Sequence, residues 1–250
     1  MNLLTRRTLL LAPIAFGGCA LQPAPPAAAP TDLPGEGQHP WTIAVPGLPE
    51  PLRCWLYLPR GHAGAAQRWP LVVFMHGSGE RGTELDRVKA HGPPKHAARG
   101  IDFPFVLVSP QLDDGQHWQP IALHLMLPVL LQRLRVDPDR VIATGLSLGG
   151  IGAWDWATAY PGDLAAIAPV CGYGDSDDVC RAAHLPVRAY HGADDTVVPI
   201  GLERESVEAL RACGGQVEHI VYPGVGHDAW NPAFEDPALV PWMLAQRRHR

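Results

Sequence analysis

The sequence has few charged residues and no excess of positive charge. Charged side chains make up 18% of its 250 residues, and 20 Lys and Arg against 25 Asp and Glu give a formal net charge of −5. The charges are spread along the chain, and basic residues neither form a stripe nor alternate with aromatic ones. This distribution argues against nucleic acid as a partner.

The N-terminus lacks an apolar run long enough to span a membrane, because its apolar segment covers only residues 8–16. Two arginines precede this segment, and two glycines and Cys19 follow it, which is the layout of an export signal. Cys19 resembles the lipid-modified cysteine of a bacterial lipobox, and the arginine pair resembles a twin-arginine signal. We expect residues 1–18 to direct export and Cys19 to anchor the mature chain to the cell envelope, facing the periplasm or in the outer membrane. An ordinary cleaved signal, giving a periplasmic or secreted protein, is the alternative.

Residues 19–40 are rich in proline and alanine, a composition that cannot pack a core. We expect a tether that holds the remaining part, residues 41–250, away from a membrane surface. That length is sufficient for one α/β domain with a substantial core and too short for two domains of the usual size.

Cysteine is scarce, at five residues. Beyond Cys19 the number is even, which favours pairing in an oxidising compartment. Cys171 and Cys180 lie close in sequence in expected loops, so we predict a disulfide between them, with free buried thiols as the alternative. The sequence assigns no partner to Cys54 or Cys213.

Apolar runs that could be buried strands alternate with helical patterns along the rest of the chain. Such alternation predicts a mostly parallel sheet covered by helices on both faces, with the active site at the carboxyl ends of the strands. The predicted strands are 53–58, 71–75, 105–108, 141–144, 164–170, 187–190 and 217–222, and the predicted helices are 121–134, 150–160, 202–213 and 239–247.

The segment Gly145-Leu146-Ser147-Leu148-Gly149 directly follows one predicted strand and has the form of a nucleophile elbow. In this turn a serine is held in a strained, exposed position, and the glycines avoid collisions of a Cβ with neighbouring backbone. The base and the acid that such a serine needs follow two later predicted strands. His227 follows the last predicted strand through a glycine turn, and Asp194 and Asp195 follow the strand before it. His227 is the candidate base, and either aspartate could orient it.

Four segments in order resemble the bacterial phospholipase/carboxylesterase group of the α/β-hydrolase superfamily, and more narrowly its exported members described as predicted peptidases or as feruloyl- and acetyl-esterase-like proteins. They are 76–82, 145–150, 191–199 and 224–230, and the resemblance covers nearly the whole chain from Trp41 onward. It implies an α/β-hydrolase fold and hydrolysis of a carboxylic ester through an acyl-serine intermediate, without metal or organic cofactor. It also selects Asp195 over Asp194 as the acid, and it makes the backbone N–H groups of Ser78 and Leu148 the expected oxyanion donors.

The sequence says less about the substrate than about the reaction. No long insertion lies between 170 and 195, so we expect no large lid and an open cleft suited to short acyl groups or to an ester on a larger molecule, such as an aryl or carbohydrate ester. Trp118, Tyr173 and Trp230 lie in segments that could line this cleft, although ordinary packing explains each equally well. A serine peptidase on the same scaffold, or a non-catalytic surface lipoprotein that binds its ligand, are the alternative functions.

Overall fold

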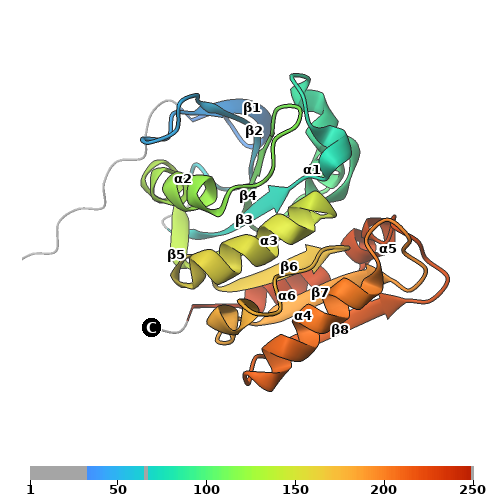
Figure 1. The fold of residues 1–250 in the computed structure, drawn as a ribbon. Helices are drawn as coiled ribbons and strands as arrows, with labels where there is room; N and C mark the ends of the chain where they lie inside the picture. Colours follow the sequence, from blue (N-terminus) through green and yellow to red (C-terminus); the bar gives the residue numbers. More distant parts are fainter. Residues whose placement is uncertain (1–32, 65–66, 249–250) are drawn as a thin grey trace, which may run out of the picture.

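The computed structural model describes residues 33–64 and 67–248, which form one eight-stranded sheet between two layers of helices (Figure 1). The predicted signal, the lipidation site Cys19 and most of the predicted tether lie outside the described residues. The strands are β1 (Gly37–Ile43), β2 (Leu52–Leu58), β3 (Trp69–Met75), β4 (Val106–Pro110), β5 (Val136–Leu146), β6 (Ala166–Val170), β7 (Val187–Gly192) and β8 (Val217–Tyr222).

The strand order across the sheet is β1-β2-β4-β3-β5-β6-β7-β8. β1 pairs antiparallel with β2, and β2 with β4, whereas all pairs from β4 to β8 are parallel. The predicted mostly parallel sheet is therefore confirmed. Because β3, β5, β7 and β8 run the same way, the segments that follow them meet at one edge of the sheet.

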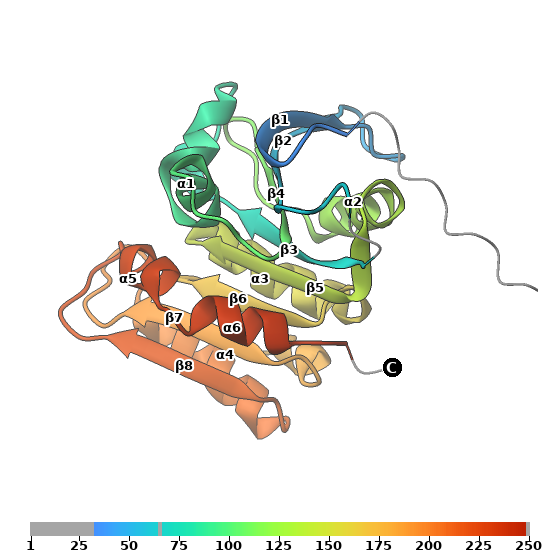
Figure 2. The ribbon, with the colours of Figure 1, turned by 180° about the vertical axis from the view of Figure 1, so that it is seen from behind.

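Helices cover both faces of the sheet (Figures 1 and 2). α2 (Pro120–Arg133), α3 (Leu148–Ala159) and α4 (Ile200–Ala212) lie on one face, and α1 (Gly92–Ala98), α5 (Trp230–Glu235) and α6 (Leu239–Ala245) lie on the other. Short 3₁₀ helices are η1 (Ser78–Glu80), η2 (Leu85–Ala90), η3 (Pro161–Asp163) and η4 (Val179–Ala182).

The strands alternate their side chains between two apolar cores, as the pleat of a sheet requires. In β3, Leu71, Val73 and Met75 pack in the core that includes α2, α3 and α4, whereas Val72 and Phe74 pack in the core on the opposite face. This two-sided burial explains why the central strands read as continuous apolar runs.

The first strand corrects the predicted boundary of the tether. β1 begins at Gly37, so residues 37–40 belong to the sheet although we placed them in the tether. Pro40 is tolerated because β1 is the edge strand, where a missing N–H need not break a ladder on both sides. Between residues 33 and 248, the 65–66 gap aside, no helix has the length and apolar character needed to cross a membrane.

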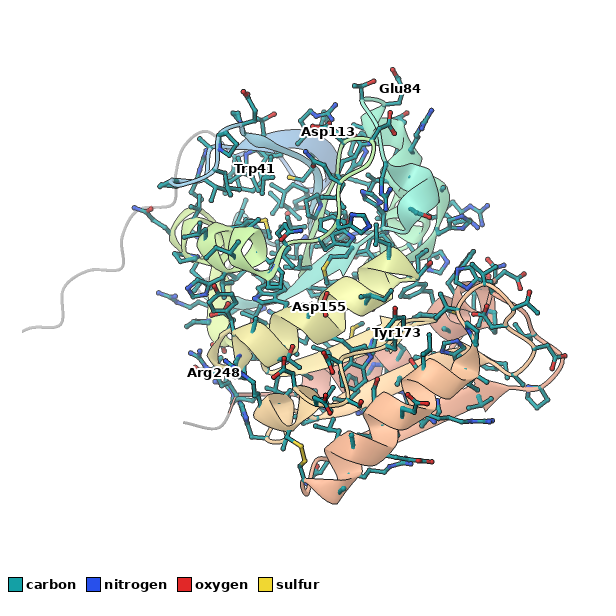
Figure 3. All side chains as sticks on the ribbon, viewed as in Figure 1. Trp41, Glu84, Asp113, Asp155, Tyr173 and Arg248 are labelled. Carbon is teal, nitrogen blue, oxygen red and sulfur yellow. A yellow bond between two sulfur atoms is a disulfide. The ribbon has the colours of Figure 1, made fainter. Side chains whose placement is uncertain are left out.

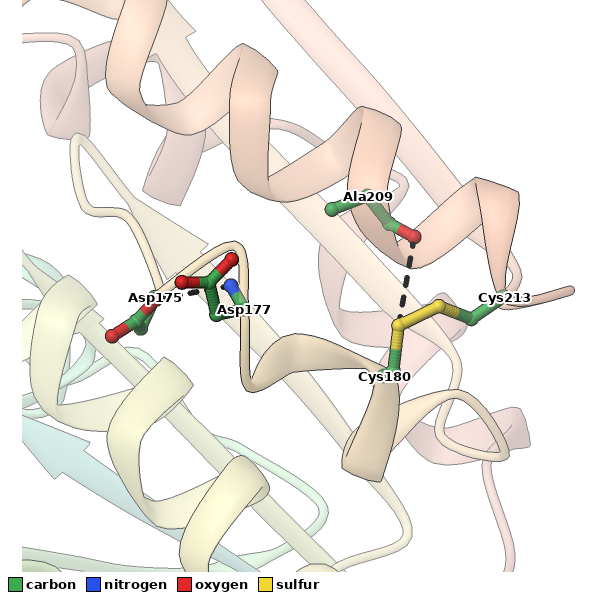
Figure 4. Close-up of a disulfide and its surroundings, with 5 residues drawn as sticks. All are labelled: Asp175, Asp177, Cys180, Ala209 and Cys213. Atoms are coloured by element: carbon green, nitrogen blue, oxygen red, sulfur yellow. Dashed lines mark hydrogen bonds between the residues drawn. A yellow bond between two sulfur atoms is a disulfide. The ribbon is translucent and has the colours of Figure 1, made fainter.

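The predicted disulfide is wrong. Cys180 of η4 pairs with Cys213, which caps the C-terminus of α4, and the two Cα atoms are 5.6 Å apart (Figure 4). Cys171 is a buried free thiol that donates to the backbone oxygen of His227, at 3.3 Å, and Cys54 is also free and buried. Nearness in sequence did not bring Cys171 to Cys180, because the residue after β6 turns into the core while η4 lies at the surface beside α4.

Candidate active site

Ser147 sits in a strained turn between β5 and α3. Its φ of 51° and ψ of −115° lie outside the regions that ordinary residues favour. A Cβ on Gly145 would lie 2.5 Å from the Met75 backbone oxygen, and a Cβ on Gly149 would lie 1.9 Å from it. The glycines on both sides of the serine are therefore needed because β3 and the start of α3 approach each other so closely.

Ser147, His227 and Asp195 form one hydrogen-bonded chain. The Ser147 Oγ is 2.9 Å from Nε2 of His227, and the Nδ1 of His227 is 2.7 Å from Oδ2 of Asp195. The three residues come from the ends of β5, β7 and β8, which are separated by up to 80 positions in sequence. This is the arrangement of a nucleophile, a base and an acid that orients the base.

Asp195 is held as a carboxylate. Burial by itself raises its pKa, but hydrogen bonds from His227 and from the N–H groups of Val198 and Val197 outweigh burial and lower the pKa below its usual value. Both N–H groups lie 2.9 Å from Oδ1. An ionised Asp195 accepts from Nδ1–H of His227, which leaves Nε2 free to accept a proton from Ser147. Asp194, by contrast, is exposed.

Ser78 and Leu148, the expected oxyanion donors, are the first residues of η1 and α3. N–H groups in the first turn of a helix have no acceptor within that helix, so they are free to bind a negative oxygen. A Cβ on Gly149 would lie 2.8 Å from the His76 backbone oxygen, which shows how closely the end of β3 approaches the elbow. The two helix starts therefore lie on neighbouring segments.

The segment that carries Ser78 is fixed by buried polar contacts. The Gly77 N–H donates to Oε2 of Glu80, at 2.9 Å. His76 is fully buried, and its Nε2 accepts from the Leu112 N–H at 3.0 Å while its Nδ1 is 2.6 Å from the Gly77 oxygen. Burial lowers the pKa of His76 to about 4. The charge of Arg81 also lowers this pKa, whereas the hydrogen bond with Gly77 raises it.

The three predicted aromatic residues have different surroundings. Trp118 is buried, and its Nε1–H donates to the His76 oxygen at 3.1 Å, so it supports the segment after β3. Trp230 begins α5, and its ring meets the His227 ring edge to face with centroids 5.2 Å apart. Tyr173 is half-buried in the segment that runs between α3 and α4 (Figure 3). Of the three, Trp230 directly contacts the triad.

A cavity of about 510 Å³ lies beside the loop after β4. Residues 48–53, the loop after β4 and the first turn of α2 line it, and Trp118 and Leu112 contribute apolar surface. Several hydrogen bonds join its wall to the segment after β3, among them those from Gly82 N–H to the Leu112 oxygen and from Gln111 Nε2 to the Glu80 oxygen.

One group of potential metal ligands lies in the described part of the chain, and it overlaps the triad. The donor atoms of Cys171, Asp195 and His227 all lie within 4.8 Å of one another. Burial raises the pKa of the Cys171 thiol to about 12, which disfavours the thiolate that a metal needs. The Asp195 and His227 atoms also bond to each other. This arrangement favours a hydrogen-bonded triad over a metal site.

Sequence reasoning missed Glu203, a fully buried carboxylate on α4. Its Oε2 lies 3.0 Å from both Nδ1 of His191 and Nε2 of His219. A signal was present, because Glu203 shares the spacing of Ser206, Val207 and Leu210 that forms the buried face of this helix.

The model of the family described as Phospholipase/Carboxylesterase matches residues 122–238, a stretch that contains the elbow, the acid loop and His227. Over this stretch, which is less than half of the chain, the protein resembles the phospholipase/carboxylesterase family, and its fold is that of an α/β-hydrolase. Among solved structures, this chain resembles a thermostable esterase at 28% identity and a TM-score of 0.74, over 85% of this chain and 64% of that one.

Two further similar proteins differ in the share of each chain that is matched. A predicted carboxymethylenebutenolidase of Salmonella typhimurium is 34% identical over 104 residues, which is 36% of this chain and 37% of that protein. The matched stretch thus spans well under half of that curated relative. The feruloyl esterase module from Clostridium thermocellum, solved with sinapinate, shares the fold with a TM-score of 0.66 at 17% identity, over 92% of this chain and 95% of that one.

Proposed function

We propose that this protein is a serine hydrolase that cleaves carboxylic esters through an acyl-serine intermediate. The observation that carries the proposal is the continuous chain from Ser147 Oγ through His227 to Asp195, with links of 2.9 and 2.7 Å. A scaffold that only binds a ligand has no need of a strained serine aligned with a base and a buried acid. The similarity of residues 122–238 to the phospholipase/carboxylesterase family supports the same reaction class.

In the acylation step, Ser147 Oγ attacks the ester carbonyl carbon while Nε2 of His227 takes the hydroxyl proton. Asp195 stabilises the imidazolium that forms, and the N–H groups of Ser78 and Leu148 bind the oxyanion, each contributing about 3 kcal/mol to lowering the barrier. His227 then returns the proton to the leaving alcohol. Water repeats the sequence on the acyl-serine and releases the acid.

The proposed substrates are esters of short acyl groups, or aryl or carbohydrate esters. Trp230 beside His227 offers an aromatic face to a flat acyl group, and the segment between β6 and β7 holds only the short helix η4, too little for a lipase-type lid. The resemblance to a feruloyl esterase fold that holds sinapinate agrees with this choice.

The proposed location is the cell envelope, reached by export and held by a lipid on Cys19. The Cys180–Cys213 disulfide supports an oxidising compartment. Intact mass of the membrane fraction tests the anchor: diacylglyceryl mass is expected on a mature chain that begins at Cys19 and is absent in Cys19→Ser. A mature chain of unmodified mass would contradict lipidation while leaving the hydrolase proposal intact.

A fluorophosphonate probe tests the nucleophile, since it reacts only with an activated serine. Wild type should be labelled, and Ser147→Ala should lose both labelling and ester hydrolysis, by about 10⁴-fold or more in the latter. A panel of p-nitrophenyl, acetyl-xylan and feruloyl esters, with peptide amides beside them, then ranks the substrates. Amide hydrolysis as fast as ester hydrolysis would favour the peptidase alternative, and the absence of labelling would favour the non-catalytic one.

A further inference from the structure

A second histidine lies behind the acid of the triad. His191 is the second-last residue of β7, is fully buried, and places its Nε2 3.3 Å from the same Asp195 oxygen that faces His227. The same Nε2 is 2.9 Å from the Val198 backbone oxygen, within the acid loop. Its other nitrogen, Nδ1, is 3.0 Å from Oε2 of Glu203. Close polar contacts thus continue from Asp195 through His191 to α4, as an ion-pair contact at Asp195 and a hydrogen bond at Glu203.

The partners of His191 determine its proton count. A backbone carbonyl only accepts hydrogen bonds, so Nε2 must carry a proton to face Val198. An ionised Glu203 also only accepts, so Nδ1 must carry a proton as well. Burial opposes the charge, but the hydrogen bonds and charge of Glu203, with help from Val198 and Asp195, raise the pKa of His191 above its usual value.

The charged and titratable groups around this histidine come from each element packed on it. Asp195 lies in its own loop, Glu203 on α4, His219 on β8 and His227 in the loop after β8. Cys171, after β6, is a protonated thiol because burial, and then Asp195 and Glu203, raise its pKa. The His191 imidazolium therefore lies between two acidic side chains, those of Asp195 and Glu203.

We propose that His191, held as an imidazolium by Glu203, is a positioning residue that fixes the Asp195 carboxylate and sets the pH range in which Ser147 is activated. The proposal rests on the proposed serine hydrolase activity. His191 bridges the side chain and the Val198 carbonyl of one loop, so it restrains the direction in which Asp195 points. Its charge also lies nearer to the Asp195–His227 pair than the charge of Glu203 does, so it opposes protonation of that pair.

Glu203→Gln is the informative substitution because it keeps the shape of the side chain and its capacity for hydrogen bonding while removing the charge. When the amide of this variant donates to Nδ1, His191 becomes neutral and donates only through Nε2–H, to the Val198 oxygen. We expect the pH of half-maximal fluorophosphonate labelling to rise by about half a unit, because a cation beside the triad has been removed. The maximal labelling rate should also fall by about 10-fold through looser placement of Asp195.

Asp163→Asn is a matched control at the opposite end of α3 from Ser147. Its Oδ2 also accepts from a histidine, His124 at 2.9 Å, and from Nε1 of Trp156 at 2.8 Å. This substitution should lower the unfolding midpoint without moving the labelling profile. If Glu203→Gln lowers stability like the control and leaves the pH midpoint unchanged or lower, the contacts of Glu203 are structural and the proposal is wrong.

Histidine side-chain NMR of the wild-type protein provides a test that does not depend on the variant folding. His191 should remain protonated on both nitrogens at pH 7.5, with assignment from the signal lost in His191→Gln. A neutral His191 at that pH overturns the proposal. Probe labelling of wild type keeps the two questions separate, since an unlabelled wild type defeats the proposed function, whereas a labelled one with an unshifted Glu203→Gln profile defeats only the role of His191.

Discussion

Two His-Gly dipeptides lie at the carboxyl ends of β3 and β7, on either side of the elbow, and their histidines differ in charge: His76 is neutral and His191 is a cation. His76 and His191 are both fully buried. His76 accepts a backbone N–H on one nitrogen, and its pKa falls to about 4, chiefly through burial. His191 faces only acceptors, and its pKa is raised despite burial because Glu203 compensates.

The difference shows that a local motif sets where a histidine lies, while distant segments decide its charge. Leu112 reaches His76 from the loop after β4, and Glu203 reaches His191 from α4. Each histidine supports one wall of the site. We call His76, Gly77 and Glu80 the oxyanion wall, and His191, Asp195 and Glu203 the acid wall.

The largest effect on catalysis is expected from removing the charge of Asp195, the residue of the acid wall that contacts His227. Asp195→Asn should lower kcat by about 10⁴-fold, because an amide cannot stabilise the imidazolium and favours the wrong tautomer of His227. Asp194→Asn, at the exposed neighbour, should stay within about 2-fold of wild type. The ratio of ester hydrolysis rates decides between them, and equal losses in the two variants would disprove the assignment of Asp195.

A disulfide supports the acid wall by joining η4 to the end of α4, the helix that carries Glu203. Closing the 33-residue separation should stabilise the fold by about 3–4 kcal/mol through reduced entropy of the unfolded chain. Urea unfolding with and without reductant measures this contribution. The double variant Cys180→Ser, Cys213→Ser should be insensitive to reductant, and a wild type equally insensitive would contradict the expected contribution.

Sequence alone located the central strands and the triad because both depend on short-range signals. Buried strands read as apolar runs, and the triad residues follow strands that all end at one edge. The disulfide and the Glu203–His191 contact were not found, since each joins segments whose proximity arises only when α4 packs on the sheet. β1 was missed because Pro40 and its proline-rich surroundings resemble a tether, and only the pairing with β2 makes it a strand.

His76 and His191 should make the free energy of unfolding depend on pH in opposite directions. The pKa of His76 is lowered from 6.5 to about 4 in the folded protein, so its contribution is present above pH 6.5 and is lost as the pH falls toward 4, by about 3 kcal/mol. The pKa of His191 is raised, so its contribution is present below pH 6.5 and is lost as the pH rises through the raised value.

Urea unfolding across this pH range separates the contribution of His76 from that of other groups. His76→Gln retains an acceptor for the Leu112 N–H and cannot titrate, so stability should fall less steeply between pH 6.5 and 4 than in wild type. His117→Gln, at an exposed histidine, should keep the wild-type slope. An unchanged slope in His76→Gln would mean that this histidine is protonated at little cost in the folded state.

The smallest of these effects concerns the geometry of the oxyanion wall. A Cβ on Gly77 would lie 2.6 Å from Cδ1 of Leu146, the buried residue before the nucleophile, and 3.1 Å from the Glu80 oxygen that accepts the Gly77 N–H. Gly79 has open space at the same point. Gly77→Ala should therefore lower kcat by about 10²-fold with little change in KM, because a displaced donor is felt mainly in the transition state, whereas Gly79→Ala should be near wild type. An equal loss in both variants would show that the site needs a flexible segment after β3 instead of a closely fitted one, and the contrast between a wall set by packing and a wall set by charge would fail.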